Sequence, residues 1–129
     1  MGAVRTVRRR VALGLAVLTA AGGLALAAPG SAQAASYCPG RQVRTLSFAT
    51  GTVHVYRRDG YVCAYTLAKH PGAKRAMSVS VQARGNRAVV DKGRYGRLAG
   101  PVTVHAGNRR VWIKGSVASG SVTSGWIQC

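Results

Sequence analysis

Hydrophobic and polar residues alternate along several short segments in the last two thirds of the chain. A period of two places apolar side chains on one face of a β-strand and polar side chains on the other. The clearest example covers residues 77–84, and its apolar members are Met77, Val79, Val81 and Ala83. The same alternation recurs at Val53 and Val55, at Val102 and Val104, and at Val111 and Ile113. These segments predict strands with one buried face and one solvated face.

One segment differs, because residues 61–67 are apolar on both faces, which predicts a central strand. Turn signals separate the segments: Asp59-Gly60, Gly85-Asn86 and Gly107-Asn108 can supply the positive φ of tight hairpins. Pro71-Gly72 and Gly100-Pro101 predict longer connections. No segment after residue 34 has the 3.6-residue period of a helix. We therefore expect an all-β fold, an antiparallel sandwich or barrel of about six to eight strands.

Near the end of the chain, Gly115-Ser-Val117 is echoed by Gly120-Ser-Val122. Two copies are too few for a tandem-repeat architecture. We expect instead a Gly/Ser-rich loop, followed by a closing strand over residues 126–129.

The first 34 residues have the pattern of a secretory signal peptide. Four arginines precede an uncharged run of 18 residues, 11–28, and Ala32-Gln33-Ala34 supplies the small side chains that signal peptidase requires. We expect a helical signal peptide over 1–34, cleavage between Ala34 and Ala35, and a single exported domain over 35–129. A membrane anchor is the alternative, since the run approaches a spanning length. Its Gly and Ala content and the cleavage site favour removal, which would leave no stable membrane span.

Charge is the second strong feature of the sequence. The chain has 129 residues, with 19 Lys and Arg, only two acidic residues, and a formal net charge of +17. Removing the first 34 residues, four of them arginines, leaves 95 residues with 15 basic side chains and both aspartates, a charge of +13. Because Asp59 and Asp91 are the only acids, paired-carboxylate catalysis and carboxylate-rich metal sites are nearly excluded.

A search for catalytic motifs finds single candidate residues but no recognisable catalytic or metal-binding motif. No Gly-x-Ser-x-Gly elbow, phosphate-binding loop or dinucleotide fingerprint is present. His54 and His105 alternate with valines, so we expect them to face solvent, and His70 precedes a proline in a predicted loop. The three cysteines lack the paired spacing of a zinc site. The sequence therefore predicts neither an enzyme, nor a cofactor, nor a metal site.

The cysteines are better explained as structural thiols. Export permits disulfides, and a small domain with a limited core often needs one. Three cysteines allow one intramolecular bridge in three ways, with one thiol left over.

Pairs and clusters of basic residues at predicted turns and strand ends could form a polyanion-binding surface. The candidates are Arg57, Arg58, Lys74, Arg75, Lys92, Arg94, Arg97, Arg109 and Arg110. Bacterial wall polymers, anionic lipid headgroups and extracellular nucleic acid would all suit such a surface. Base stacking could use Tyr56, Tyr61, Tyr65 and Tyr95, although nucleic acid is not the favoured partner. The alternative is that the charge only keeps the protein soluble.

Several landmarks of residues 35–129 occur in an order that resembles the spore-associated protein A family, small exported proteins of filamentous, spore-forming actinobacteria. They are Cys38, Tyr61-Val-Cys63-Ala-Tyr-Thr, the alternating segment 77–85, Val90-Asp91-Lys-Gly93-Arg-Tyr95, Leu98-Ala99-Gly100-Pro101-Val102, Gly115-Ser-Val117 and the terminal Cys129. The resemblance implies an exported protein attached to spores or aerial cells, without a defined catalytic activity.

The resemblance also implies a disulfide pairing. The family pattern has a further cysteine where this chain has Arg110, and the simplest pairing of four cysteines joins the first to the second and the third to the fourth. On that basis we expect a Cys38–Cys63 bridge and an unpaired Cys129, which could form an intermolecular disulfide.

Two functions follow as hypotheses. The first is a noncatalytic, secreted protein of the cell surface or spore, held on anionic wall or spore-surface polymers by its basic residues. The second is a diffusible effector, either a protease inhibitor presenting the loop 70–75 to a trypsin-like enzyme or a cationic antimicrobial protein. The oligomeric state is left open.

Overall fold

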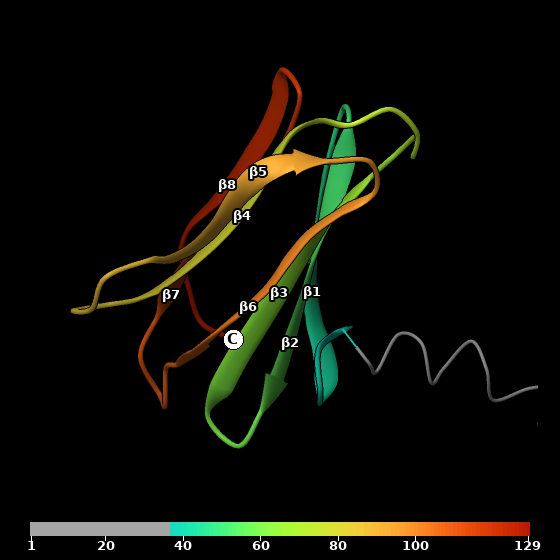
Figure 1. Cartoon of the computed structure of the whole chain (residues 1–129). Helices are drawn as coiled ribbons and strands as arrows, with labels where there is room; N and C mark the ends of the chain where they lie inside the picture. The colour runs from blue at the N-terminus through green and yellow to red at the C-terminus, as the bar shows by residue number, and fades with distance from the viewer. Residues whose placement is uncertain (1–36) are drawn as a thin grey trace, which may run out of the picture. The chain divides into compact units, whose positions relative to one another are not determined.

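The computed structural model describes residues 37–129, which form eight strands (Figure 1). The predicted signal peptide and its cleavage site between Ala34 and Ala35 lie outside the described residues. No helix in the described part is long and apolar enough to cross a membrane. The strands are β1 (Arg41–Phe48), β2 (Gly51–Arg58), β3 (Tyr61–Ala68), β4 (Arg75–Ala83), β5 (Val89–Tyr95), β6 (Leu98–His105), β7 (Val111–Val117) and β8 (Gly120–Ile127).

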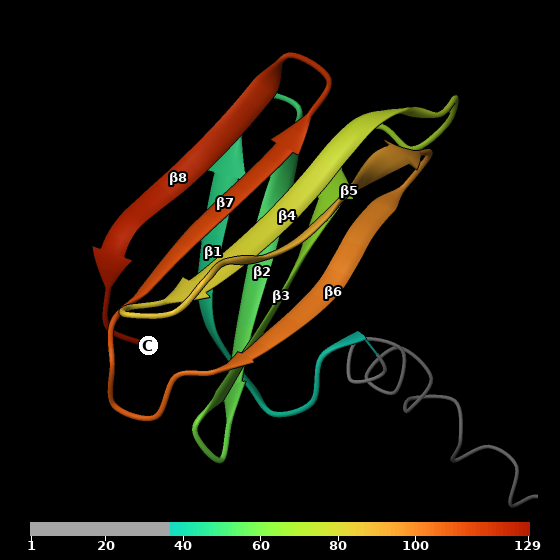
Figure 2. The ribbon, with the colours of Figure 1, turned by 60° about the vertical axis from the view of Figure 1, so that its left-hand side comes forward.

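The strands form two four-stranded sheets, with the orders β1-β2-β3-β6 and β5-β4-β7-β8. Every neighbouring pair is antiparallel. In Figure 2 the second sheet lies in front of the first, which is the arrangement of a sandwich. The expected all-β, antiparallel fold is therefore confirmed, and eight strands fall within the expected number.

The core lies between the sheets and is built from the alternating positions that the sequence marks. On β4 the buried side chains are Met77, Val79, Val81 and Ala83, as predicted. Val53 and Val55 of β2 and Val111, Ile113 and Val117 of β7 face the same interior. These are mostly β-branched residues, which pack well on a pleated surface.

Strand β3 is central in its sheet, between β2 and β6, as predicted from its apolar character. Its second face is covered by a small cluster on the outside of the sandwich, formed by Cys38, Tyr56, Cys63 and Tyr65. A disulfide joins Cys38 to Cys63 and ties the segment before β1 to the middle of β3. Cys129 is free and half-buried. The pairing implied by the family resemblance is therefore confirmed.

Two of the predicted turns join paired strands. Asp59 and Gly60, with φ of 50° and 83°, form the two-residue connection of β2 and β3. Gly85, with φ of 91°, lies in the connection of β4 and β5. The third expectation is wrong in its geometry, because Gly107-Asn108 lies between β6 and β7, which belong to different sheets. A positive φ at a glycine identifies a sharp bend but not which strand follows.

Gly100-Pro101 does not form a connection, contrary to expectation, but lies inside β6. The register of β3 and β6 shifts between Ala64 and Thr66, so the ladder is irregular at this point. Strand β6 is at the edge of its sheet, where a proline without an N–H is tolerated. The Gly100 N–H donates instead to Asp91 Oδ2, at 2.7 Å.

The expected Gly/Ser-rich loop is also wrong. Gly115-Ser-Val117 ends β7 and Gly120-Ser-Val122 begins β8, and the two strands pair directly, with Val117 opposite Gly120. Gly115 is buried, and a Cβ at this position would overlap Val53 and Thr66 of the facing sheet. In the sequence this glycine suggests a loop, but in the structure it lies in a strand where the two sheets approach each other.

Candidate functional site

Eight arginines gather at one end of the sandwich, which we call the arginine pole. It is formed where the β2–β3 turn, the β4–β5 turn and the β6–β7 connection approach one another, toward the lower left of Figure 2. Its members are Arg41, Arg44, Arg57, Arg58, Arg84, Arg87, Arg109 and Arg110.

Backbone hydrogen bonds hold the three connections together. The N–H groups of Ala106 and Gly107 both donate to the carbonyl oxygen of Gly60, and the Arg84 N–H donates to Arg110 O. Arg41 enters the pole because it lies opposite Arg57 in the β1–β2 ladder. The positions of these basic residues are therefore fixed by the ends of the strands and not by flexible tails.

Some of the arginines bind the protein itself. The Arg109 guanidinium donates to three carbonyl oxygens, those of His105, Ala106 and Arg84, over 2.7–3.2 Å. Arg57 donates through Nη2 to Gly107 O, while its Nη1 is buried with no acceptor among residues 37–129. Carbonyl oxygens leave the positive charge uncompensated, so these contacts order the pole without neutralising it.

Arg44 has a similar role near the C-terminal end of the chain. Its Nη2 donates to Gln128 O at 3.0 Å, and the Gln128 amide donates to Asn108 O at 3.0 Å. Arg84 instead lies over the ring of Trp126, 5.5 Å from its centroid. The outward-facing part of the pole thus consists of the other exposed arginines, Arg41, Arg58, Arg87 and Arg110.

The pole has little acidic compensation. Asp59 is its one acidic side chain, and the Arg58 Nε to Asp59 Oδ2 distance is 3.8 Å, with both side chains largely exposed. An exposed pair of this kind contributes little free energy and is screened by salt. The result is a concentrated positive potential at one end of the domain, suited to a polyanion.

The nine basic residues predicted from the sequence do not form one surface. Arg57, Arg58, Arg109 and Arg110 lie in the pole. A second group lies at the opposite end, where the β3–β4 connection meets the β5–β6 turn, and consists of Lys74, Arg75, Arg94 and Arg97. Lys92 lies in the middle of β5, opposite Ser78.

Sequence reasoning missed four members of the pole, Arg41, Arg44, Arg84 and Arg87, and also Lys69 at the opposite end. These residues are single arginines or lysines, whereas the prediction followed pairs and close clusters. Arg84, Arg87 and Lys69 lie beside predicted turns, which was the only signal available for them, and nothing in the predicted turns pointed to Arg41 or Arg44. Which turns share an end depends on strand order, which a sequence pattern does not reveal.

The tyrosines do not form the base-stacking surface considered above. Tyr56 and Tyr65 are only 8% and 4% exposed, because they pack over the disulfide on the outside of β2 and β3. Tyr95 is half-buried and donates its hydroxyl to Asp91 Oδ1 at 2.6 Å. Tyr61 alone is well exposed, at 51%, with its ring centroid 4.8 Å from that of His105. Stacking on Tyr56 and Tyr65 is therefore excluded by burial.

The histidine prediction holds for His105, which is exposed, but is wrong for His54. His54 is half-buried, stacks on Tyr65 at 5.2 Å between ring centroids, and its Nδ1 lies 2.9 Å from Gln42 Nε2. Burial lowers the pKa of His54. The alternation rule placed this residue on the solvent side of β2, but the tyrosine cluster covers that side.

Two further titratable groups, Asp91 and Cys129, have structural surroundings. Asp91 accepts hydrogen bonds from Tyr95 and Gly100 and so connects β5 to β6. Burial raises the pKa of the Cys129 thiol, and the nearby positive charges of Arg44 and Arg57 partly oppose this. Across residues 37–129, no three His, Cys, Asp or Glu side chains lie close enough together to hold a metal ion.

The segment proposed for protease inhibition, residues 70–75, covers most of the β3–β4 connection and the first residue of β4, and it is mostly exposed. Arg75 is folded back onto this loop, because its guanidinium donates to Ala73 O and His70 O. Lys74 is exposed. An inhibitory contact through this loop would therefore present Lys74 and not Arg75.

Comparisons of the chain with protein-family models, with curated proteins and with solved structures found no match.

Proposed function

We propose that this protein is a noncatalytic, secreted protein of the cell or spore surface, retained on anionic polymers by the arginine pole. The observation that carries the proposal is the collection of eight arginines, from strands distant in sequence, around a single acidic side chain. The pattern of a signal peptide and the resemblance to spore-associated proteins agree with this assignment. Anionic wall or spore-surface polymers are the proposed partners.

The proposed interaction is electrostatic and does not depend on a shaped pocket. Arg41, Arg58, Arg87 and Arg110 are exposed, and of the four only Arg58 has a carboxylate beside it, so they can meet phosphates or carboxylates. Guanidinium groups bind both anions through paired N–H donors. A surface of this kind gives rapid association and strong dependence on salt.

A charge-reversal pair tests the proposal. Arg87→Glu/Arg110→Glu changes the pole without removing a side-chain hydrogen bond, whereas Arg109 is unsuitable because it holds three loop carbonyls. The matched control is Lys74→Glu/Arg97→Glu, which causes the same change in net charge at the opposite end. Each protein, expressed from the full-length sequence, is bound to isolated bacterial walls and eluted with a salt gradient.

We expect the pole variant to elute at clearly lower salt than the wild type and the control variant to elute near the wild type. Equal shifts for both variants would show that net charge matters and the pole does not. Retention of the pole variant at high salt would exclude electrostatic binding. Fractionation of the producing cells into medium, wall and spore surface then tests the proposed location.

The alternative is a diffusible effector, and the exposed loop with Lys74 is the feature that keeps it under consideration. Recovery almost entirely in the medium would favour it. Titration against trypsin-like proteases and against live bacteria would then decide, and inactivity in both assays would eliminate this alternative.

A further inference from the structure

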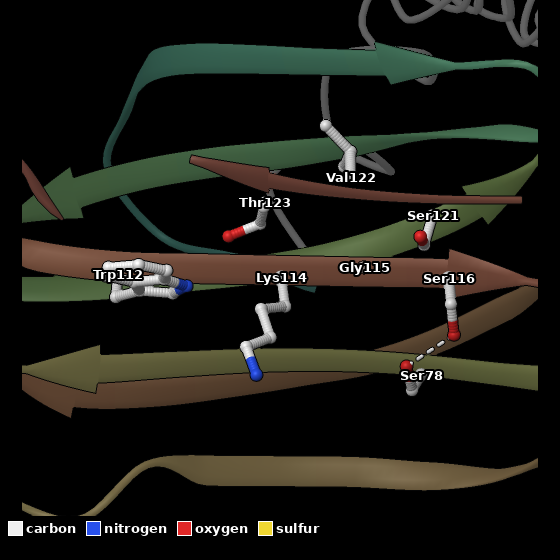
Figure 3. Close-up of a pocket in the computed structure, with 8 residues that line it drawn as sticks. All are labelled: Ser78, Trp112, Lys114, Gly115, Ser116, Ser121, Val122 and Thr123. Carbon is white, nitrogen blue, oxygen red and sulfur yellow. Dashed lines mark hydrogen bonds between the residues drawn. The ribbon is translucent and has the colours of Figure 1, made fainter. Parts of the chain in front are cut away.

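A groove of about 560 Å³ crosses the outer face of the β5-β4-β7-β8 sheet, away from the core (Figure 3). Its size is within the range of small-ligand sites. The lining comes from β4, β7 and β8, and the side chains used below are Trp112, Lys114, Ser78, Ser116, Ser121 and Thr123. The opposite faces of these three strands pack on the core, and this packing holds the groove residues in place.

Trp112 provides an aromatic wall at one end of the groove. The ring of Trp126 meets it edge-on, with 5.3 Å between ring centroids, and Arg84 lies over Trp126. These contacts fix the orientation of Trp112. Its indole nitrogen points along β7 toward Lys114 in Figure 3, is shielded from solvent, and has no acceptor among the described residues. A ligand hydroxyl that reached this N–H would supply an acceptor for it.

The rest of the groove is hydroxylated and basic. Ser78 and Ser116 hydrogen-bond to each other at 2.6 Å, and Ser121 and Thr123 line the opposite side, on β8. Lys114 extends from the centre of this surface, is exposed, and has no salt-bridge partner in the described part of the chain.

The charge of the surrounding sheet face is also positive. Lys92 lies opposite Ser78 and Arg94 opposite Ala76, so both project from this face of β5. Asp91 lies opposite the buried Val79 and is held by Tyr95 and Gly100, so its carboxylate is directed away from the groove. An anionic group on a ligand would therefore meet Lys114 without repulsion from a carboxylate.

We propose that this groove binds a glycan chain that carries carboxylate or phosphate groups, with a sugar ring against Trp112 and an anionic group at Lys114. An indole presents an apolar face to the C–H groups of a sugar, while short hydroxyls exchange hydrogen bonds with its hydroxyls. The groove adjoins the arginine pole through Trp126, over which Arg84 lies, but no arginine of the pole lines it. It would therefore add recognition of the sugar to the salt-dependent retention proposed above.

Trp112 itself provides a direct measurement. The chain has two tryptophans, so Trp126→Phe leaves Trp112 as the single indole reporter. The variant is titrated with three soluble probes: peptide-free glycan strands of peptidoglycan, which carry carboxylates; wall teichoic acid, which carries phosphates; and chitotetraose, which is neutral. We expect saturable changes in emission with one or both acidic probes, and the response identifies which anion is recognised.

Two matched pairs of variants assign the binding to the groove. We expect Trp112→Ala to weaken binding of the acidic probe by about tenfold, as for an aromatic anchor, and Trp126→Phe, which keeps a ring against Trp112, to weaken it much less. Similarly, Lys114→Gln should weaken binding severalfold, whereas Lys69→Gln, at an exposed position after β3 of the other sheet, should have little effect. Affinities of these variants are measured by calorimetry, and unfolding midpoints confirm that each is folded.

Several results would overturn the proposal. These are no response to any probe, equal binding of chitotetraose with no effect of Lys114→Gln, or loss of binding only in the Arg87→Glu/Arg110→Glu protein. A dimer in sedimentation that Trp112→Ala dissociates would show that the groove holds a second copy of the chain. Since the pole variants change Arg87 and Arg110, which do not line the groove, either proposal can fail without the other.

Discussion

Gly115 shows how a single residue is explained only by what faces it. It lies in the middle of β7, where glycine is normally unfavourable because it loses entropy and has no side chain to pack. Here the absence of a side chain allows Val53 and Thr66 of the other sheet to approach the β7 backbone. Thr66 is itself buried and donates its hydroxyl to Ser78 O at 2.9 Å, so it has little freedom to move away.

We predict that Gly115→Ala lowers the free energy of unfolding by about 1–3 kcal/mol, because the added methyl overpacks the core. Gly72→Ala is the control, since its Cβ would meet only Arg75 Nη2, at 3.6 Å. It should change stability by less than about 0.5 kcal/mol. Urea unfolding followed by fluorescence measures both, and equal effects would contradict the packing explanation.

His54 predicts a pH dependence of stability. Burial lowers its pKa in the folded state, so between that pKa and about 6.5 the unfolded chain binds more protons than the folded chain. The contribution of His54 is therefore complete above pH 6.5 and is lost as the pH falls toward the folded-state pKa.

We expect His54→Phe, which keeps a ring against Tyr65, to show a smaller loss of stability than the wild type between pH 7.5 and 5.5. Urea midpoints at a series of pH values measure the difference. The same slope in both proteins would mean that other groups cause the dependence.

At the scale of elements, most strands bury the side chains that their hydrophobic alternation selects. The exceptions occur where a strand packs against a segment outside its own sheet. β4 and β7 bury the residues that alternation selects. The outer side of β2 and β3 instead carries Tyr56, His54 and Tyr65 under the segment that the disulfide holds. Alternation predicts which side chains share a face, but not whether a distant segment covers that face.

The disulfide is the element-scale feature with the largest expected energy. Cys38 and Cys63 are 25 residues apart, and closing a loop of this length stabilises the folded protein by about 3 kcal/mol in the chain-entropy view. Cys38→Ala/Cys63→Ala should therefore lose about that much free energy of unfolding, whereas Cys129→Ser should lose much less. Denaturant titration of the three proteins under oxidising conditions tests this. A double variant as stable as the wild type would refute it.

At the scale of the whole molecule, the two ends of the sandwich are both basic, with only two carboxylate side chains in the entire chain. The eight arginines of the pole repel one another, and Coulomb repulsion of this kind opposes folding. Carbonyl oxygens around Arg57 and Arg109 order the groups but do not cancel their charge.

We predict that sodium chloride, raised from low concentration to about 0.5 M, increases the urea midpoint at pH 7. Added salt shortens the screening length to a few ångströms and so weakens this repulsion. Replacing two exposed members of the pole, as in Arg87→Gln/Arg110→Gln, should raise the midpoint at low salt and reduce the salt effect. A midpoint that falls with salt would show that favourable ion pairs dominate instead.

The sequence by itself determined the fold class, the faces of the alternating strands, the central position of β3 and the excess of positive charge. These follow from local physics, since alternation, turn residues and side-chain charge act within a few residues of chain. The family resemblance, and not the residue pattern, selected the Cys38–Cys63 pairing that the structure bears out.

Only the tertiary structure decided which basic residues share an end, that Tyr56, Tyr65 and His54 are covered, and that Gly100-Pro101 and the Gly/Ser motifs belong to strands. It also brought Trp112, Lys114 and the hydroxyls of β4 and β8 into one groove. The physical reason is the same in each case. Strand order and the packing of one sheet on the other bring together residues far apart in sequence, and the local pattern carries no record of those partners.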